Sequence, residues 1–241
     1  MNEAFDGPWV VGIDGCPGGW VAVGRPSGAG GALRVLVAER LEELLAAFAP
    51  WRVAGVDMPI GLSDSGPRHC DELARARLGV RGASVFPAPL RPALFAATHA
   101  EASALSRQCG GKGVSVQAWH LFARVREVDA LLAEGAGRQE RMVEVHPELS
   151  FLALNADEPL PGSKHRIDGI YRRRALIAGA FGWPAIESAV AQLSGTRVKE
   201  DDLLDAFAVL WSAERVAAGA SVSLPADPPR DGRGLPMRIV F

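Results

Sequence analysis

The hydrophobic spacing changes within the first 57 residues, and this change restricts the folds open to the chain. Three short apolar runs, at residues 9–13, 20–23 and 33–38, are separated by glycine-rich turns and predict an antiparallel meander. Residues 39–48 then carry leucine and phenylalanine at the three-and-four spacing of an amphipathic helix, and residues 53–56 form a short buried strand. A strand, helix, strand unit requires a crossover, so the last strand should run parallel to one already in the sheet. The sequence therefore predicts an α/β fold with a mixed sheet.

Helical spacing dominates the rest of the chain. It recurs in six segments, around residues 70–78, 92–106, 118–133, 147–154, 167–181 and 200–218. Because no strand pattern of comparable strength interrupts the first three, residues 63–138 are expected to form a helical insertion. A further strand is expected at residues 141–145, and the last five residues, MRIVF, should form an edge strand or lie extended. The length of 241 residues favours one domain over residues 1–241 that carries this insertion.

Composition and charge exclude several functional classes. The formal net charge of -2 provides no overall positive field for holding nucleic acid, so any such binding must use a local patch. No apolar segment approaches the roughly 20 residues that span a bilayer, and the N-terminus lacks the basic and apolar regions of a signal peptide. The three cysteines, Cys16, Cys70 and Cys109, are widely spaced without a CxxC pair, which indicates neither a disulfide framework nor a zinc site. A reducing, cytoplasmic location is expected.

Carboxylates placed at the ends of predicted elements are the main chemical signal. The patterns GxGxxG, GxxxxGK[ST], HExxH and GxSxG are absent, which disfavours the common dinucleotide, P-loop, zincin and hydrolase sites. Asp14, Asp57 and Glu144 instead end three predicted strands, while Asp202 and Asp205 lie near the start of the last long helix. Because the carboxyl ends of parallel strands meet at one edge of a sheet, these acidic groups could converge there.

Three of these carboxylates also have a simpler structural explanation. Asp14 precedes a glycine in a turn, Asp57 could hydrogen-bond its own loop, and Asp202 could complement the positive end of a helix dipole. Asp205 is more informative, because it lies among leucine, alanine and phenylalanine in a helix that must pack on the sheet. A carboxylate in such a position needs a partner, a metal or water.

A divalent cation would relieve the repulsion among clustered carboxylates. Hard oxygen ligands select Mg²⁺ or Mn²⁺, and the expected ligands are Asp14, Asp57, Asp202 and Asp205. Two such ions about 3.5 to 4 Å apart can generate hydroxide and stabilise the leaving oxygen in phosphodiester cleavage. The predicted catalytic set consists of these four aspartates and Glu144.

Several other polar residues could contact a substrate. His146, in the segment EVHPEL, could transfer a proton, bind a metal or serve only as a structural cap at the end of the strand. Arg91, Lys164 and Arg173 belong to local basic clusters that could meet a phosphate backbone, although such clusters more often form a solvated face. These four residues are the candidate substrate-binding set.

Seven ordered segments resemble one known family. They are GIDGCPGGWVAV, VAGVDMPIGL, RHCDELARARLG, SVFPAPLR, SVQAW, VEVHPELSF and DDLLDAFA, and they are similar to the domain of unknown function 429 family, whose members are described as predicted ribonuclease-H-like nucleases. The resemblance implies a ribonuclease-H-like core with a five-stranded mixed sheet, helices on both faces and a helical insertion after the fourth strand. By motif position it also implies metal-binding carboxylates at Asp14, Asp57 and Asp205, with Asp202 adjacent and Glu144 or Glu148 as an additional group.

Three functional hypotheses follow. The first is a Mg²⁺- or Mn²⁺-dependent phosphodiesterase acting on nucleic acid. The second is a phosphotransferase or nucleotide-binding protein, because the turn IDGCPGGW is similar to the phosphate loop of the actin and sugar-kinase group. The third is a non-catalytic binding or scaffold protein in which the acidic residues serve only structure.

Overall fold

The computed structural model describes residues 7–28, 31–161 and 166–241, which fall into two compact units. The first unit comprises residues up to 57, residues 141–221 and Phe241, and the second comprises residues 58–140 and 222–240. The predicted helical insertion at residues 63–138 lies within the second unit. Among the described residues, no helix is both long and apolar enough to span a membrane.

A five-stranded mixed sheet forms the centre of the first unit, as predicted. Its strands are β1 (Trp9–Cys16), β2 (Gly19–Pro26), β3 (Arg34–Ala38), β4 (Trp51–Val56) and β5 (Met142–Glu144), in the order β3-β2-β1-β4-β5. β2 pairs antiparallel with both β1 and β3, whereas β4 pairs parallel with both β1 and β5. β1 and β2 are longer than expected because their pairing continues to Cys16 and Gly19 beside the tight turn, and to Trp9 and Pro26 at the other end.

Within the described residues, five helices lie wholly in the first unit. They are α1 (Leu41–Ala47), α6 (Pro147–Leu154), α7 (Ile167–Phe181), α8 (Trp183–Gln192) and α9 (Glu200–Ala217). α8, which starts close to Pro184, was not predicted from the sequence. Gly182 has a φ of 86° and separates α7 from α8, and a proline in the first turn of a helix removes no helical hydrogen bond.

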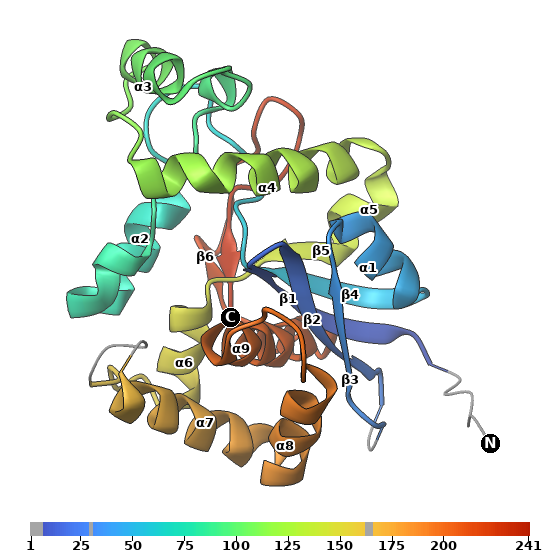
Figure 1. Ribbon diagram of the computed structural model, residues 1–241. Coiled ribbons are helices and arrows are strands. Elements are labelled where there is room, and N and C mark those ends of the chain that lie inside the picture. Colours follow the sequence, from blue (N-terminus) through green and yellow to red (C-terminus); the bar gives the residue numbers. More distant parts are fainter. Residues whose placement is uncertain (1–6, 29–30, 162–165) are drawn as a thin grey trace. The chain divides into compact units, whose positions relative to one another are not determined.

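Glycines on β1 and β4 allow α9 to pack closely on one face of the sheet (Figure 1). A Cβ atom on Gly12 would lie 2.1 Å from the backbone nitrogen of Leu210, and one on Gly55 would lie 2.8 Å from Val209 Cγ1. On β2, a Cβ atom on Gly24 would instead meet the Phe48 ring that follows α1. Gly24 pairs with Val11, whose Cβ lies on the face of the sheet opposite to the Cβ position of Gly12. α1 and α9 therefore cover opposite faces.

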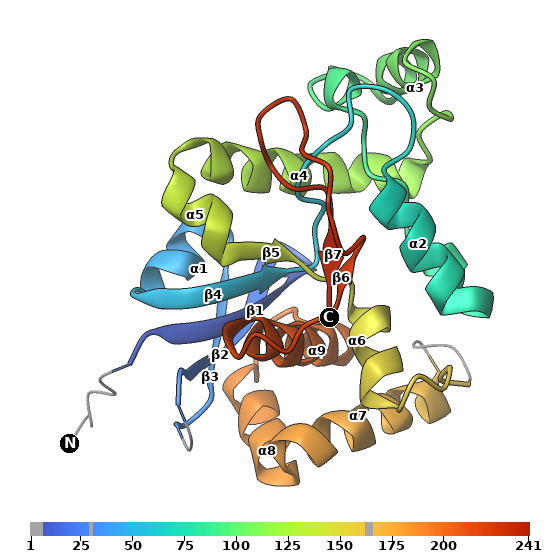
Figure 2. The same cartoon turned by 180° about the vertical axis from the view of Figure 1, so that it is seen from behind.

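The second unit is mainly helical (Figure 2). Its elements are α2 (His69–Leu78), the 3₁₀ helices at Gly79–Ser84 and Arg91–Ala93, α3 (His99–Gln108), α4 (Val116–Ala133), most of α5 (Ala136–Arg141), β6 (Ser223–Leu224) and β7 (Ile239–Val240). The helix expected from residue 92 begins later, because the hydroxyl of Thr98 caps α3 by accepting a hydrogen bond from the Glu101 backbone nitrogen. Of the two conformations expected for MRIVF, a strand is found at β7, which pairs with β6 in a separate two-stranded sheet.

Candidate functional site

Two of the predicted carboxylates lie side by side at the ends of paired strands. β1 and β4 are in parallel register up to Ile13 and Val56, and the Asp57 backbone nitrogen donates a hydrogen bond to Ile13 O at 3.0 Å. Asp14 and Asp57 are therefore next to each other in the sheet, and the alternation of side chains places both on the face of Gly12 and Gly55. Asp14 is only 7% exposed, and its Oδ1 accepts a hydrogen bond from the Gly15 backbone nitrogen at 2.8 Å.

The direction of α9 brings Asp205 to the same edge. Ala206 and Leu210 lie over Gly12, while Glu214 forms an ion pair with Arg25, which is in register with the start of β1. The helix thus runs antiparallel to β1, with its N-terminus at the end where Asp14 and Asp57 follow the strands. Asp205 is 3% exposed and lies one turn before Val209, the residue that packs on Gly55 of β4. We call Asp14, Asp57 and Asp205 at this end of the sheet the carboxylate edge.

Asp202 lies one turn before Asp205 and caps the helix. Its Oδ2 accepts a hydrogen bond from the Lys199 backbone nitrogen at 3.1 Å. Burial raises the pKa of Asp202, and the neighbouring charges of Asp201 and Asp205 act in the same direction, while the Lys199 hydrogen bond opposes them. The folded state therefore disfavours the ionised form of Asp202 relative to the unfolded state.

The raised pKa gives a pH-dependent prediction for Asp202→Asn. Because its pKa is raised, Asp202 binds its proton more tightly in the folded state than in the unfolded state. The resulting stabilisation is fully present below pH 3.8, the ordinary pKa of an aspartate, and is lost as the pH rises through the folded-state pKa. An asparagine retains the oxygen that accepts from Lys199 but carries no charge. The variant should gain free energy of unfolding relative to the parent at pH 7, and the difference should shrink as the pH falls towards 3.8. Urea unfolding in EDTA at several pH values measures this; a difference that is constant with pH contradicts it.

The fifth strand carries Glu144 to the same end of the sheet but onto the other face. Glu144 is in register with Val56, one position before Asp57. Val145 Cγ2 lies 3.2 Å from the Cβ position of Gly55, so Val145 is on the α9 face and the preceding Glu144 points away from it. The structure thus separates Glu144 from the carboxylate edge. His146 follows as the N-terminal cap of α6 and is partly buried.

A buried ion pair joins α6 to α7. Arg173 Nη2 lies 2.5 Å from Glu148 Oε1, and the two side chains are 1% and 9% exposed. Nη1 of Arg173 also donates to Gly169 O at 3.4 Å, and the guanidinium lies 5.1 Å from the centre of the Phe151 ring. Arg173, predicted to bind substrate, is thus enclosed by protein and bound to Glu148, in the first turn of α6.

Arg91 and Lys164 are the other predicted cationic contacts. Arg91 belongs to the second unit, where its guanidinium lies 3.2 Å from Asp129 and 2.5 Å from Asp231. The pKa of Asp231 is lowered overall. Burial acts to raise it, but the hydrogen bonds that Asp231 accepts from three backbone nitrogens and from Arg91 outweigh burial. Arg91 therefore stabilises the interior of its own unit. Lys164 lies outside the described residues.

The donor chemistry of the carboxylate edge suits a hard divalent cation such as Mg²⁺ or Mn²⁺. Its three carboxylates come from β1, the residue after β4, and α9, and Asp202 lies one helical turn away. Across residues 7–28, 31–161 and 166–241, however, no three His, Cys, Asp or Glu side chains are gathered closely enough to hold a metal ion. Cation binding would require these side chains to rotate towards one another.

Two interactions could not be predicted from the sequence. The Glu148–Arg173 pair joins residues 25 positions apart, and the Arg25–Glu214 pair joins residues 189 positions apart. Both pairs depend on how helices pack in three dimensions. No pattern in the sequence links the two members of either pair.

Comparison with known proteins identifies a family. The model of the family described as "Protein of unknown function (DUF429)" matches residues 12–230. No curated protein and no solved structure matches the chain significantly.

Proposed function

For this chain, which belongs to the DUF429 family, we propose a ribonuclease-H-like fold and a divalent-cation-dependent phosphodiesterase activity on nucleic acid. The observation that carries the proposal is the carboxylate edge. Asp14, Asp57 and Asp205 come from distant parts of the sequence, yet strand register and the direction of α9 bring them to one end and one face of the sheet. Carboxylates in such an arrangement repel one another unless a cation compensates their charge.

In this proposal Asp14, Asp57 and Asp205 hold Mg²⁺ or Mn²⁺, and Asp202 lies beside them. When bound, the ions supply an activated hydroxide and neutralise the charge that develops on the phosphate. The packing of α9 on β1 and β4 fixes the backbone of Asp205 at this edge, and binding of a cation would turn the Asp14 side chain from its present hydrogen bond with Gly15. The positive end of the α9 dipole favours negative groups at this edge. His146, at the start of α6, is the proposed contact to substrate.

The proposed site leaves out three residues of the predicted set. Glu144 points to the other face of the sheet, Arg173 is bound to Glu148, and Arg91 is bound to Asp129 and Asp231. Since neither Arg173 nor Arg91 is available, the negative charge of a nucleic-acid phosphate would be neutralised mainly by the cation. We expect strong dependence on the concentration of divalent cation.

Thermal unfolding in EDTA and in millimolar Mn²⁺ or Mg²⁺ tests the cation site. A ligand that binds only the folded state raises the unfolding temperature of the protein by mass action. At a ligand concentration 100 times the dissociation constant, the free energy of unfolding increases by about 2.7 kcal/mol. The parent should show this rise, and Asp14→Asn and Asp205→Asn should lose it. Glu43→Gln removes an exposed carboxylate on α1 and should behave as the parent does.

An opposite result would favour a non-catalytic protein. In that case the cation has no effect on the parent, and Asp14→Asn and Asp205→Asn are as stable as the parent or more stable, because only repulsion has been removed. An equal rise in all four proteins would place the cation elsewhere in the chain.

A further inference from the structure

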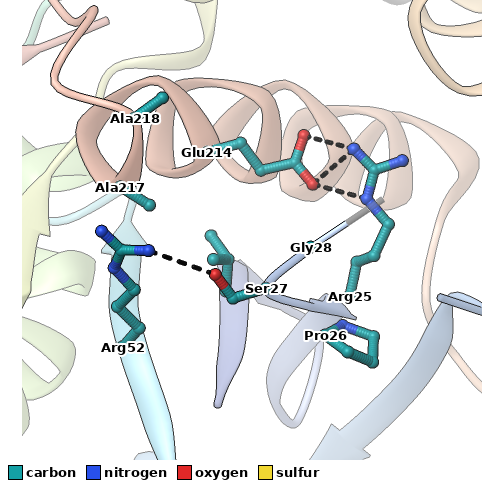
Figure 3. Close-up of a pocket in the computed structure, with 9 residues that line it drawn as sticks. Arg25, Pro26, Ser27, Gly28, Arg52, Glu214, Ala217 and Ala218 are labelled. Atoms are coloured by element: carbon teal, nitrogen blue, oxygen red, sulfur yellow. Dashed lines mark hydrogen bonds and ion pairs between the residues drawn. The ribbon is translucent and has the colours of Figure 1, made fainter. Parts of the chain in front are cut away.

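A cavity of about 260 Å³ lies at the opposite end of the sheet from the carboxylate edge (Figure 3). It is bounded by the start of β1, the end of β2, the start of β4 and the last turn of α9, all in the first unit. Four polar side chains line it: Arg25, Ser27, Arg52 and Glu214. None of them takes part in the proposed phosphodiesterase site.

A β-bulge directs Arg52 into this cavity. Trp9 pairs with Trp51 and the next residue, Val10, pairs with Val53, so Arg52 is the extra residue in β4. Bulges are rare in parallel pairs, and they re-aim side chains that would otherwise follow the strand alternation. Because of the bulge, Arg52 lies on the α9 side of the sheet, where Figure 3 shows it beneath the end of the helix.

The two arginines of the cavity differ in how they are bound. Arg25 donates from Nε and Nη2 to the two Glu214 oxygens, each at 2.7 Å, and the charges of this pair compensate each other. Within the described part of the chain, Arg52 makes one hydrogen bond, a long one of 3.4 Å from Nη1 to Ser27 Oγ. Most of the guanidinium donors of Arg52 are therefore open to a ligand. The charged side chains of the cavity sum to about +1, which the negative C-terminal end of the α9 dipole partly offsets.

The other wall of the cavity is apolar. It consists of Val10, Pro26, Ala217 and Ala218. The volume of about 260 Å³ is close to the lower limit of about 300 Å³ for pockets that hold drug-sized molecules, so the ligand should be smaller. One charged group and a small apolar body would fill the space.

We propose that this cavity binds a small organic oxyanion, a molecule with a terminal phosphate or carboxylate group and a short apolar body. The planar guanidinium of Arg52 would donate two parallel hydrogen bonds to the oxyanion, and the Ser27 hydroxyl a third. The apolar body would lie against Pro26 and Ala217. The Arg25–Glu214 pair forms the neutral side of the cavity and fixes the end of α9 to β2.

The test is a titration followed by ¹H–¹⁵N NMR at constant ionic strength, with inorganic phosphate, phenyl phosphate and acetate as probes. The amide signals of Ser27, Gly28 and Ala217 should shift with saturation. Phenyl phosphate should bind several-fold more tightly than inorganic phosphate because it also contacts the apolar wall. Saturation with the phosphates alone, or with acetate alone, would identify which oxyanion the cavity accepts.

Three variants make the test specific. Arg52→Ala should weaken binding about tenfold or more, because hydrogen bonds to charged groups are the strong ones in such sites. Arg52→Lys, which keeps the charge but loses the planar fork, should lie between Arg52→Ala and the parent. Arg172→Ala removes an exposed arginine of α7 and should bind as the parent does. The proposal is overturned if no probe gives saturable shifts at these amides in the folded parent, or if Arg52→Ala binds as tightly as the parent.

Discussion

Replacing Arg173 by methionine should lower the free energy of unfolding by about 3–5 kcal/mol, because it leaves the Glu148 carboxylate buried without its cation. The two side chains are 1% and 9% exposed, so water can replace little of what Arg173 supplies. Methionine fills similar space beside Phe151, which keeps the loss of packing small. Urea denaturation of the parent and the variant at pH 7 measures the difference.

The double variant Arg173→Met with Glu148→Gln separates charge burial from packing. A neutral glutamine no longer needs the guanidinium, so the double variant should recover much of the lost stability, since replacing both partners of a buried pair is often nearly neutral. If Arg173→Met alone stays within about 1 kcal/mol of the parent, the value expected for an exposed pair, then the pair does not hold α6 and α7 together.

Gly12→Ala should be destabilising by about 3 kcal/mol or more, at the upper end of overpacking effects. A Cβ atom at this position would lie 2.1 Å from Leu210 N and 2.3 Å from Ala206 O. Both are backbone atoms of α9, so no side-chain rotation can relieve the overlap, and the helix must move away from β1. Chemical denaturation measures the loss of stability, and the displacement of α9 should also change the environment of Asp205.

Gly179→Ala is the matched control for this substitution. Gly179 lies in α7, and nothing is within 4 Å of the position that a Cβ atom would take. Alanine is the better helix former, so this variant should be stabilised by about 0.5–1 kcal/mol. The account of α9 packing is contradicted if the two substitutions have similar effects.

The mixed character of the sheet and most helices could be predicted from the sequence because both follow local spacing, whereas the order of the strands was not predicted. The alternation of apolar runs and glycine turns specifies the meander, and the helix at residues 39–48 forces the crossover that makes β4 parallel to β1. α8 was missed because a glycine and a proline at its start indicate a break, and the same residues also suit a helix start. The start of α3 was placed too early because the effect of the Thr98 cap depends on the conformation of the chain before it.

The candidate site was predictable to the extent that it depends on strand ends. Asp14 and Asp57 lie together because each follows a strand of the same parallel pair, and such neighbours can be inferred from topology. The face on which Glu144 lies depends on the register of β5, and the partner of Arg173 depends on the packing of α6 on α7. The cavity at Arg52 was not predicted either. Arg52 reaches it because of a β-bulge, and a single arginine near the start of a strand does not indicate a bulge.

The most direct measurement of the proposed function is the hydrolysis of phosphodiester bonds by the parent and by Asp205→Asn. The substrates are bis(4-nitrophenyl) phosphate and labelled DNA and RNA oligonucleotides, each tested in Mn²⁺, in Mg²⁺ and in EDTA. We predict hydrolysis by the parent only with the cation, and a kcat/KM at least about 100-fold lower for Asp205→Asn, because a lost ligand should cost at least as much as the 10–100-fold of a lost outer-shell partner. No cation-dependent hydrolysis by a folded parent, or equal rates for the two proteins, would contradict the account.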